Sequence, residues 1–350
     1  MQTELSTKEI IEKNEEYRRK KWLRNIAILI VTAVVLFTSL IISAGLGYSK
    51  IPAWNAVRTF FGLGSDKEEM ILFQFRMPRI AFSAMVGAAL AVSGAVMQAM
   101  TRNPLADASL MGITSGGGLM VALYAMMAGS SNAIAMYTLP VFSLLGSGLA
   151  AFIVYILANR GEDRSPVRLV LTGIAVQAGI TALTTVLIVK LNEGEYDAYQ
   201  TWLTGSMGSV SWTAVLSLLP WLLILLPAAF IKAPKLDILT LGPETATGLG
   251  FDSAREQKKI LAISVALAAA AVALAGNVGF VGLVAPHLGR RLVGPKHSIL
   301  LPVSALLGAV LVTAADTLGR IILQPMGLPA GILTAVIGAP YFIYLLSKED

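Results

Sequence analysis

Residues 76–118 read RMPRIAFSAMVGAALAVSGAVMQAMTRNPLADASLMGITSGGG, and this stretch decides the fold. It begins with two arginines on either side of Pro78, a residue that suits the first turn of a helix. About twenty uncharged residues follow, enough to cross a bilayer core of roughly 30 Å at about 1.5 Å per residue. Gly87, Ala91 and Ala95 recur at every fourth position, so one helix face is nearly bare of side chains. We expect that face to contact another helix closely rather than face lipid.

The composition of the whole chain places it in a membrane. Of its 350 residues, 55% are hydrophobic and 14% are charged, and the mean hydropathy is +0.71. A soluble domain carries about 25% charged residues. The net charge of +6 comes from basic residues scattered between apolar runs, which membrane orientation explains better than nucleic-acid binding does. Cysteine is absent and only two histidines occur, which excludes a disulfide framework and a cysteine-based zinc site.

The apolar runs predict an all-α polytopic membrane protein with about ten transmembrane helices. When residue 1 is taken as cytoplasmic, 20 of the 27 Lys and Arg residues fall in the tail and loops on the inside, and 7 fall outside. Basic residues favour the cytoplasmic side, so we expect both termini to be cytoplasmic. The predicted spans are 26–47, 79–100, 108–128, 138–158, 168–190, 212–231, 258–275, 278–293, 300–322 and 330–346.

The segments outside the spans also carry signals. Residues 1–25 form a basic tail whose acidic and basic residues alternate at i, i+4, which predicts a short surface helix beside anionic lipid. The outside loops 48–78 and 191–211 are long enough for short interfacial helices. We expect one transmembrane domain over 26–347, with its longest cytoplasmic loop at about 232–258.

Several ordered motifs carry a resemblance to a known family. They are R-x-P-R at 76–79, GAALAVSGAVMQA at 87–99, RNPLAD at 102–107, NVGFVGLVAPH at 277–287 followed by Arg290, ADTLGR at 315–320, and LPAGILTAVIGAPYFIYLL at 328–346. Together they resemble the permease subunit of ABC importers for iron-siderophores, haem and vitamin B12, over roughly residues 25–347. The resemblance implies a type II ABC importer architecture in a bacterial cell membrane.

The resemblance also implies partners and their contact residues. It implies an extracytoplasmic substrate-binding protein that docks on Arg76, Arg79 and Arg320; the alternative is that these arginines only snorkel to the interface. It implies P-loop ATPase subunits that dock on a short cytoplasmic helix, whereas composition alone would describe 232–258 as a solvated linker. A second permease chain, identical or related, would complete the pore. The implied coupling residues are Leu241, Gly242, Glu244, Thr245, Ala246, Leu249 and Gly250.

Energy and cargo are constrained by what the sequence contains. No G-x-x-x-x-G-K-[ST] motif occurs, so the chain is not an ATPase enzyme, and ATP and Mg²⁺ would bind to a partner subunit. A path for bare metal ions would need several carboxylates or imidazoles, and these are scarce here; His287 is more simply structural. A chelated iron needs only a wide, weakly interacting passage. Candidate passage residues, which could equally serve helix packing, are Ser93, Met97, Thr114, Ser115, Thr172 and Gln177.

We therefore predict the permease of an importer for a metal chelate, with ferric siderophore as the first choice and haem or cobalamin as alternatives. An ion-coupled secondary transporter is the main competing class, and in it Asp316 would be the coupling site. In the permease, Asp316 instead forms an intrahelical pair with Arg320. A membrane-embedded enzyme would need clustered catalytic side chains, and the sequence shows no such cluster.

Overall fold

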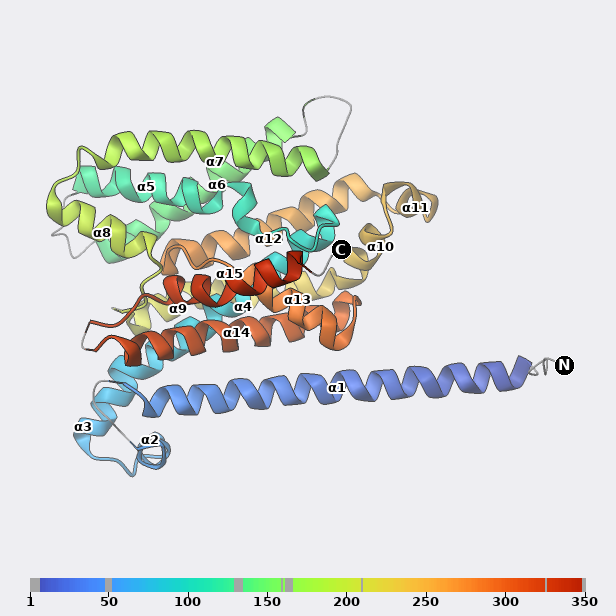
Figure 1. Cartoon of the computed structure of the whole chain (residues 1–350), viewed down its shortest axis with the longest axis horizontal. Helices are drawn as coiled ribbons and strands as arrows, with labels where there is room; N and C mark the ends of the chain where they lie inside the picture. The colour runs from blue at the N-terminus through green and yellow to red at the C-terminus, as the bar shows by residue number, and fades with distance from the viewer. Residues whose placement is uncertain are drawn as a thin grey trace.

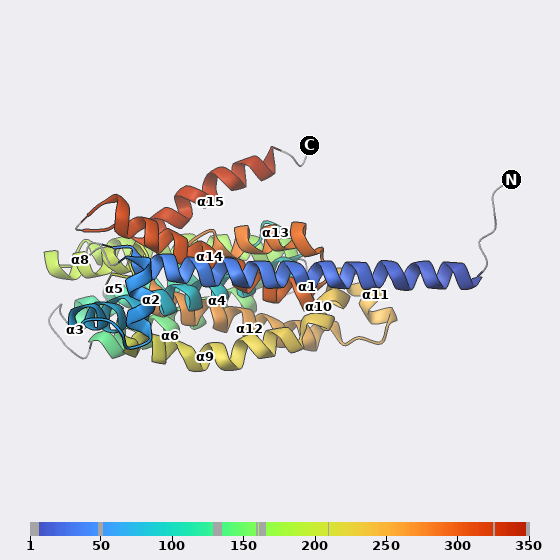
Figure 2. The same cartoon turned by 90° about the horizontal axis from the view of Figure 1, so that it is seen from below.

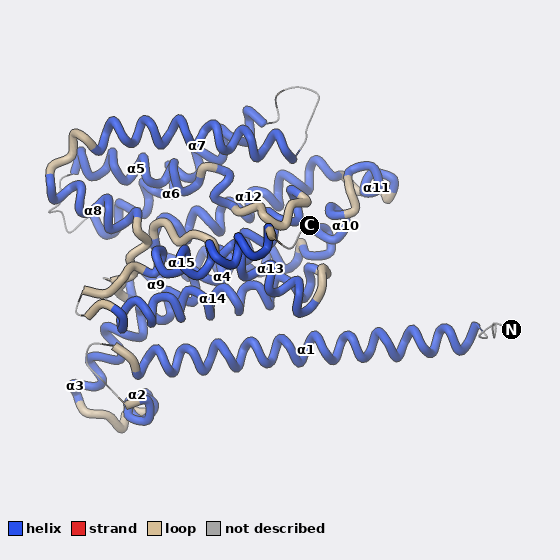
Figure 3. Tube along the Cα trace, in the orientation of Figure 1, coloured by secondary structure: helices blue, strands red, loops and turns tan. Residues whose placement is uncertain are grey.

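The computed structural model describes residues 7–47, 52–128, 135–158, 160, 166–208, 210–324 and 326–347, and all regular structure in these ranges is helical (Figures 1 and 3). The elements, in chain order, are α1 (Thr7–Gly45), α2 (Ala53–Phe60), α3 (Asp66–Glu69), the π-helix η1 (Met70–Arg76), α4 (Met77–Thr101), the 3₁₀ helix η2 (Ala108–Met111), α5 (Ile113–Ala128), α6 (Ala135–Ala158), α7 (Pro166–Ile188), α8 (Glu193–Leu203), α9 (Trp212–Ile231), α10 (Ala233–Thr240), α11 (Pro243–Gly248), α12 (Ser253–Ala275), α13 (Val281–Val293), α14 (His297–Ile322) and α15 (Ala330–Leu346).

Each of the ten predicted spans coincides with a helix. Within the described ranges, seven helices are long and apolar enough to cross a membrane, and two shorter apolar helices cover Ile113–Met127 and Ala330–Tyr344. The tenth, α13, has only 13 residues and follows Phe280, whose backbone is left-handed at φ 66°. The chain is therefore an all-helical, multi-pass membrane protein.

The connecting segments sort to two ends of the bundle. Both views place α2, α3 and α8 at one end, and α10 and α11 at the other (Figures 1 and 2). The first group comes from the loops predicted outside and the second from the loop predicted inside, so the alternation read from the sequence agrees with the structure. The short helices predicted in 48–78 and 191–211 are present as α2, α3 and α8; their interfacial position stays a prediction.

The basic tail differs from its prediction. It does not form a separate surface helix, because residues 7–45 form one continuous helix of 39 residues, α1. The segment contains no proline, and its only glycine is the last residue, so no residue breaks the helix between tail and span. Glu16 and Lys20 form the expected i, i+4 ion pair at 2.6 Å. At about 1.5 Å per residue the helix is about 58 Å long, and Figure 2 shows its N-terminal part extending beyond the bundle.

The bare face of α4 packs as predicted. A Cβ atom on Gly87 would lie 2.1 Å from the carbonyl oxygen of Gly308 on α14, and one on Gly94 would lie 2.1 Å from the carbonyl oxygen of Gly282 on α13. Such distances leave no room for any side chain, so these helices meet backbone to backbone. These close contacts pack α4 against both α13 and α14, and the arginine cluster and the pocket described below are built around these three helices.

Candidate functional site

The first candidate site is an arginine cluster, which we define as Arg76, Arg79 and Arg320 together with Asp316. The Arg79 Nε lies 2.8 Å from Oδ1 of Asp316 and 3.1 Å from Oδ2, and Nη2 lies 2.8 Å from Oδ1. The Asp316 side chain is 1% exposed and that of Arg79 is 18% exposed. The predicted pair between Asp316 and Arg320 also forms, with Nε 3.3 Å from Oδ2. Two arginines thus neutralise one buried carboxylate, and Arg79 makes the shorter contacts.

The other function of the cluster is to hold the end of α1. Arg320 donates to the carbonyl oxygens of Leu46 at 3.1 Å and Ser43 at 3.3 Å, and Arg76 donates to the carbonyl oxygen of Ala44. The last carbonyl groups of a helix lack partners within the helix, and cationic side chains satisfy them well. Sequence reasoning missed this contact because α1 and α14 lie far apart along the chain.

The structure brings the three predicted docking arginines together, but only part of each is accessible. Arg76 is 6% exposed as a residue, and the Arg320 side chain is 10% exposed. Arg79 is the most accessible of the three, with its side chain 18% exposed. The cluster lies at the end that carries α2 and α3, since Arg76 ends η1, which directly follows α3 in the continuous helix from Asp66 to Thr101. Docking on this cluster remains a prediction.

The second candidate site is the segment formed by α10 and α11. The predicted short helix is confirmed as α11, which begins after Gly242 at φ 102° and is followed by Gly250 at φ 73°. Both glycines have left-handed backbones, so a residue with a Cβ atom would be strained there. Leu241 is 58% exposed and Leu249 is 65% exposed, whereas Ala246 is fully buried. The helix is therefore anchored at its centre and presents a leucine on each side; Thr245 is exposed and Glu244 lies in the first turn.

Ion pairs fix the base of this segment to α12. Lys232 and Lys235 place their Nζ atoms 2.8 and 2.9 Å from Oε2 of Glu256. The hydrogen bond to Glu256 raises the pKa of the Lys232 ammonium. The ion pairs orient α10 and α11 relative to the span that follows them.

The predicted passage residues do not share one surface in this chain. Ser93 is fully buried and exchanges hydrogen bonds with Ser264 of α12, its hydroxyl donating to the Ser264 carbonyl oxygen at 2.7 Å. Met97 is 1% exposed and belongs to the buried hydrophobic core. These two residues therefore pack helices. The other four are partly accessible on α5 and α7, and they are Thr114, Ser115, Thr172 and Gln177.

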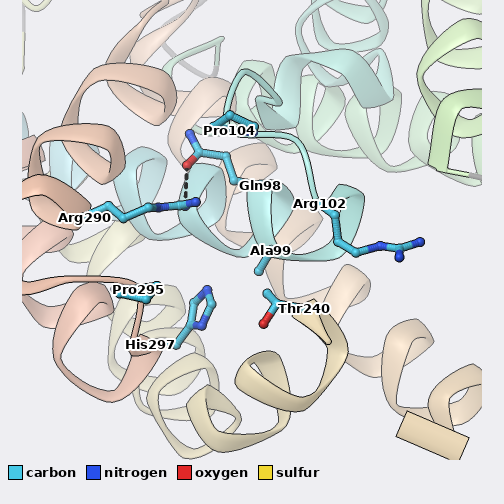
Figure 4. Close-up of a pocket in the computed structure, with 8 residues that line it drawn as sticks. All are labelled: Gln98, Ala99, Arg102, Pro104, Thr240, Arg290, Pro295 and His297. Carbon is cyan, nitrogen blue, oxygen red and sulfur yellow. Dashed lines mark hydrogen bonds between the residues drawn. The ribbon is translucent and has the colours of Figure 1, made fainter. Parts of the chain in front are cut away.

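A pocket of about 240 Å³ lies between α4, α10 and the segment from α13 to α14 (Figure 4). Arg290 extends toward Gln98, and its Nη2 donates to the Gln98 amide oxygen at 3.0 Å. The Gln98 nitrogen donates to the carbonyl oxygen of Gly282 at 3.1 Å. On the opposite wall the His297 Nδ1 lies 2.6 Å from Oδ1 of Asp237. Sequence reasoning missed this pocket, although Arg102 and Arg290 both belong to the quoted motifs.

Two other polar residues have structural roles. Asp107 caps η2, since its Oδ1 accepts from the Ala108 amide at 2.6 Å. The His287 ring packs edge-on against Tyr341, with ring centroids 5.8 Å apart. Within the described ranges, no group of three or more His, Cys, Asp or Glu residues could hold a metal ion.

Comparison with known proteins supplies the family. Residues 32–348 match the FecCD transport family. The chain belongs to this family. The FecCD chain is 41% identical over 327 residues to "Iron(3+)-hydroxamate import system permease protein FhuG" of Bacillus subtilis, covering 92% of this chain and 97% of that one. It is 42% identical over 330 residues to "Fe(3+)-citrate import system permease protein YfmE" of the same organism, covering 94% and 97%.

A solved structure supports the same architecture. The FecCD chain superposes with a TM-score of 0.81 and 30% identity on an inward-facing structure of a transporter assigned to the metal-chelate ABC type, covering 93% of this chain and 99% of that one. The match extends across nearly all the spans described above. The protein is therefore a permease of an ABC importer, and the family and fold predicted from its motifs are confirmed.

Proposed function

We propose that this permease carries a ferric chelate across the cell membrane of a bacterium. The observation that carries the proposal is the FecCD match over residues 32–348 together with the names of the relatives. Those at 41–42% identity are named for iron(3+)-hydroxamate, siderophore and Fe(3+)-citrate transport. A relative named for cobalamin is 37% identical. The iron chelates are therefore favoured over cobalamin, and no relative above is named for haem.

The energy for import comes, in this proposal, from ATP bound to separate P-loop ATPase subunits. The exposed Leu241 and Leu249 flank α11 and offer an apolar contact for such a subunit. Single exposed leucines are common on protein surfaces, but here two of them lie on either side of a helix whose centre is buried. A second permease chain, identical or related, completes the passage, and Thr114, Ser115, Thr172 and Gln177 are its candidate lining.

Delivery of the chelate requires an external binding protein, which we propose to dock on the arginine cluster. A guanidinium suits two-point pairing with a carboxylate, and Arg79 keeps part of its surface accessible. Asp316 then has a positioning role, because it fixes the direction of both Arg79 and Arg320.

Uptake measurement tests the cargo. Cells lacking their own permease and expressing this chain with candidate ATPase and binding-protein subunits are given ⁵⁵Fe loaded on a hydroxamate siderophore or on citrate, or labelled cobalamin or haem. We expect uptake of a ferric chelate that persists with an ionophore while ATP is maintained. Uptake that collapses with the ionophore would favour a secondary transporter, and preferential uptake of cobalamin or haem would overturn the cargo. Gentle purification should retain an ATPase, and a second permease in equal amount would indicate a heterodimer.

Docking is tested separately with a charge-balanced variant. R79Q/D316N removes the accessible guanidinium without leaving an unpaired buried carboxylate, and R58Q removes an exposed arginine of α2 as a matched control. We expect weaker binding of the purified binding protein to R79Q/D316N than to wild type or R58Q. Equal binding by all three proteins would exclude Arg79 from the docking surface.

A further inference from the structure

The pocket of Figure 4 is basic and has no acidic residue in its lining. Three of its lining residues are basic: Arg102, Arg290 and His297. It lies at the end of the bundle that carries α10 and α11, since Thr240 at the end of α10 forms part of its wall. Nothing in the importer function described above uses this pocket, so its chemistry needs its own explanation.

Arg290 provides the first argument for an anion. Its residue is half-buried, and the hydrogen bond that it makes goes to the neutral amide of Gln98. The Nε atom is buried without a hydrogen-bond partner, and Arg290 forms no ion pair within the described ranges. Burying a charge is costly unless an opposite charge accompanies it. The guanidinium therefore lacks the counter-charge that such a position requires.

His297 provides the second and independent argument. The residue is 3% exposed, and its Nε2 atom is buried without a partner. Asp237 accepts from the backbone N–H of His297 at 2.9 Å and lies 2.6 Å from Nδ1. This contact places the ring proton on Nδ1. Nε2 then accepts from a protonated phosphate oxygen when the ring is neutral, and it donates to an anion when the ring is charged.

Arg102 adds an exposed charge at the rim. It is exposed, makes no ion pair within the described chain, and points its guanidinium away from His297 (Figure 4). Turning this long side chain toward a bound anion would break no ion pair of the described chain. The pocket volume of about 240 Å³ is larger than the volume that several water molecules occupy in the liquid, at about 30 Å³ each. A tetrahedral oxyanion and some of its hydration water therefore fit in it.

We propose that this pocket binds a phosphate group, supplied either by the headgroup of an anionic lipid or by free phosphate. Guanidinium groups match phosphate oxygens in geometry and charge. Basic pockets between helices on the cytoplasmic side are a known setting for anionic headgroups. The site is distinct from the arginine cluster, which lies at the opposite end of α14, and its binding does not depend on which chelate the permease carries.

The test uses the full-length protein, with any subunits that it retains, in two arms. In one arm, protein in phosphatidylcholine nanodiscs is titrated with inorganic phosphate by calorimetry, against chloride at equal ionic strength. In the other, detergent-solubilised protein is mixed with phosphatidylglycerol or with phosphatidylcholine, and bound lipid is counted by native mass spectrometry. The variants are R102Q and R290Q, with R291Q as matched control, because Arg291 is exposed on the same helix and does not line the pocket.

We expect saturable binding in at least one arm. R102Q should weaken it about fivefold or more, as loss of one cationic contact to an anionic headgroup implies, and R291Q should leave it unchanged. Binding of phosphate alone identifies free phosphate as the ligand, and preferential retention of phosphatidylglycerol identifies a headgroup. No binding in either arm, or binding that R102Q and R290Q leave at the wild-type level, overturns the proposal. R102Q carries this decision if R290Q fails to fold, because Arg102 is exposed and unpaired.

Discussion

Replacing Arg79 with glutamine should destabilise the protein through the carboxylate that it leaves behind. Asp316 is 1% exposed, and after R79Q its remaining ionic contact is Arg320 at 3.3 Å. Breaking a buried ion pair by removing one partner costs about 3–5 kcal/mol. Because Arg320 stays in place, we expect about 3 kcal/mol for R79Q, the low end of that range. The same reasoning predicts a smaller cost for D316N. Arg79 would still be partly exposed to solvent, and Arg320 would still donate to the carbonyl oxygens of Leu46 and Ser43.

The double variant R79Q/D316N isolates the interaction between the two residues. Its cost should fall short of the sum of the single costs by about 2 kcal/mol, within the range for residues in direct contact. Neutral polar pairs between membrane helices average only about 0.6 kcal/mol, and the higher value is expected here because the pair is ionic and involves two guanidinium nitrogens.

Thermal unfolding in a mild detergent measures the cycle. At about 2.1 cal/mol/K per residue, a loss of 1 kcal/mol lowers the melting temperature of this 350-residue chain by roughly 1.4 °C, so R79Q should melt about 4 °C below wild type. R58Q on α2 is the control and should melt with wild type. A cycle in which the single effects simply add would show that the carboxylate is compensated elsewhere, and it would refute the assignment of Arg79 as its main partner.

Two further predictions concern packing and coupling. G87A should destabilise the bundle by about 1–3 kcal/mol, because the added Cβ atom would lie 2.1 Å from the Gly308 carbonyl oxygen. G148A, where a Cβ atom would meet open space, is the control in the same melting assay. Equal melting temperatures for G87A and G148A would contradict the close contact. L249E should reduce chelate uptake and the amount of ATPase that co-purifies. Because Leu249 is 65% exposed, the melting temperature should stay within about 1 °C of wild type. Unchanged uptake would remove Leu249 from the coupling surface.

The helices could be predicted because length and composition determine them almost alone. A run of about twenty apolar residues in a chain with 14% charged residues has few alternatives to a membrane helix. The spacing of Gly87, Ala91 and Ala95 also predicted a helix contact, which the structure shows. Neither the composition nor this spacing identifies the partner helix. Both describe one helix at a time, whereas the contact with α14 depends on how all the helices pack together.

The polar contacts could be predicted only where they are local. The i, i+4 spacing of Asp316 and Arg320 revealed their pair, whereas the shorter contact with Arg79 joins positions 237 residues apart. The same limit hid the bond between Gln98 and Arg290, 192 residues apart. The prediction that the tail ends near residue 25 as a separate helix was wrong for a different reason. A change from polar to apolar composition was interpreted as a boundary, although no proline or glycine lies between the tail and the span to break the helix there.

Helix α14 joins the two ends at which partners are proposed to bind. Its first residue, His297, contacts Asp237 of α10, and near its other end Asp316 and Arg320 form the arginine cluster. With 26 residues it spans about 39 Å at about 1.5 Å per residue. Its contact with α4 at Gly87 is made between backbones, so the two helices cannot shift past one another by small side-chain rearrangements. A displacement of the arginine cluster must therefore move α14 together with α4 or break the contact at Gly308, and the first alternative carries the motion directly to α10.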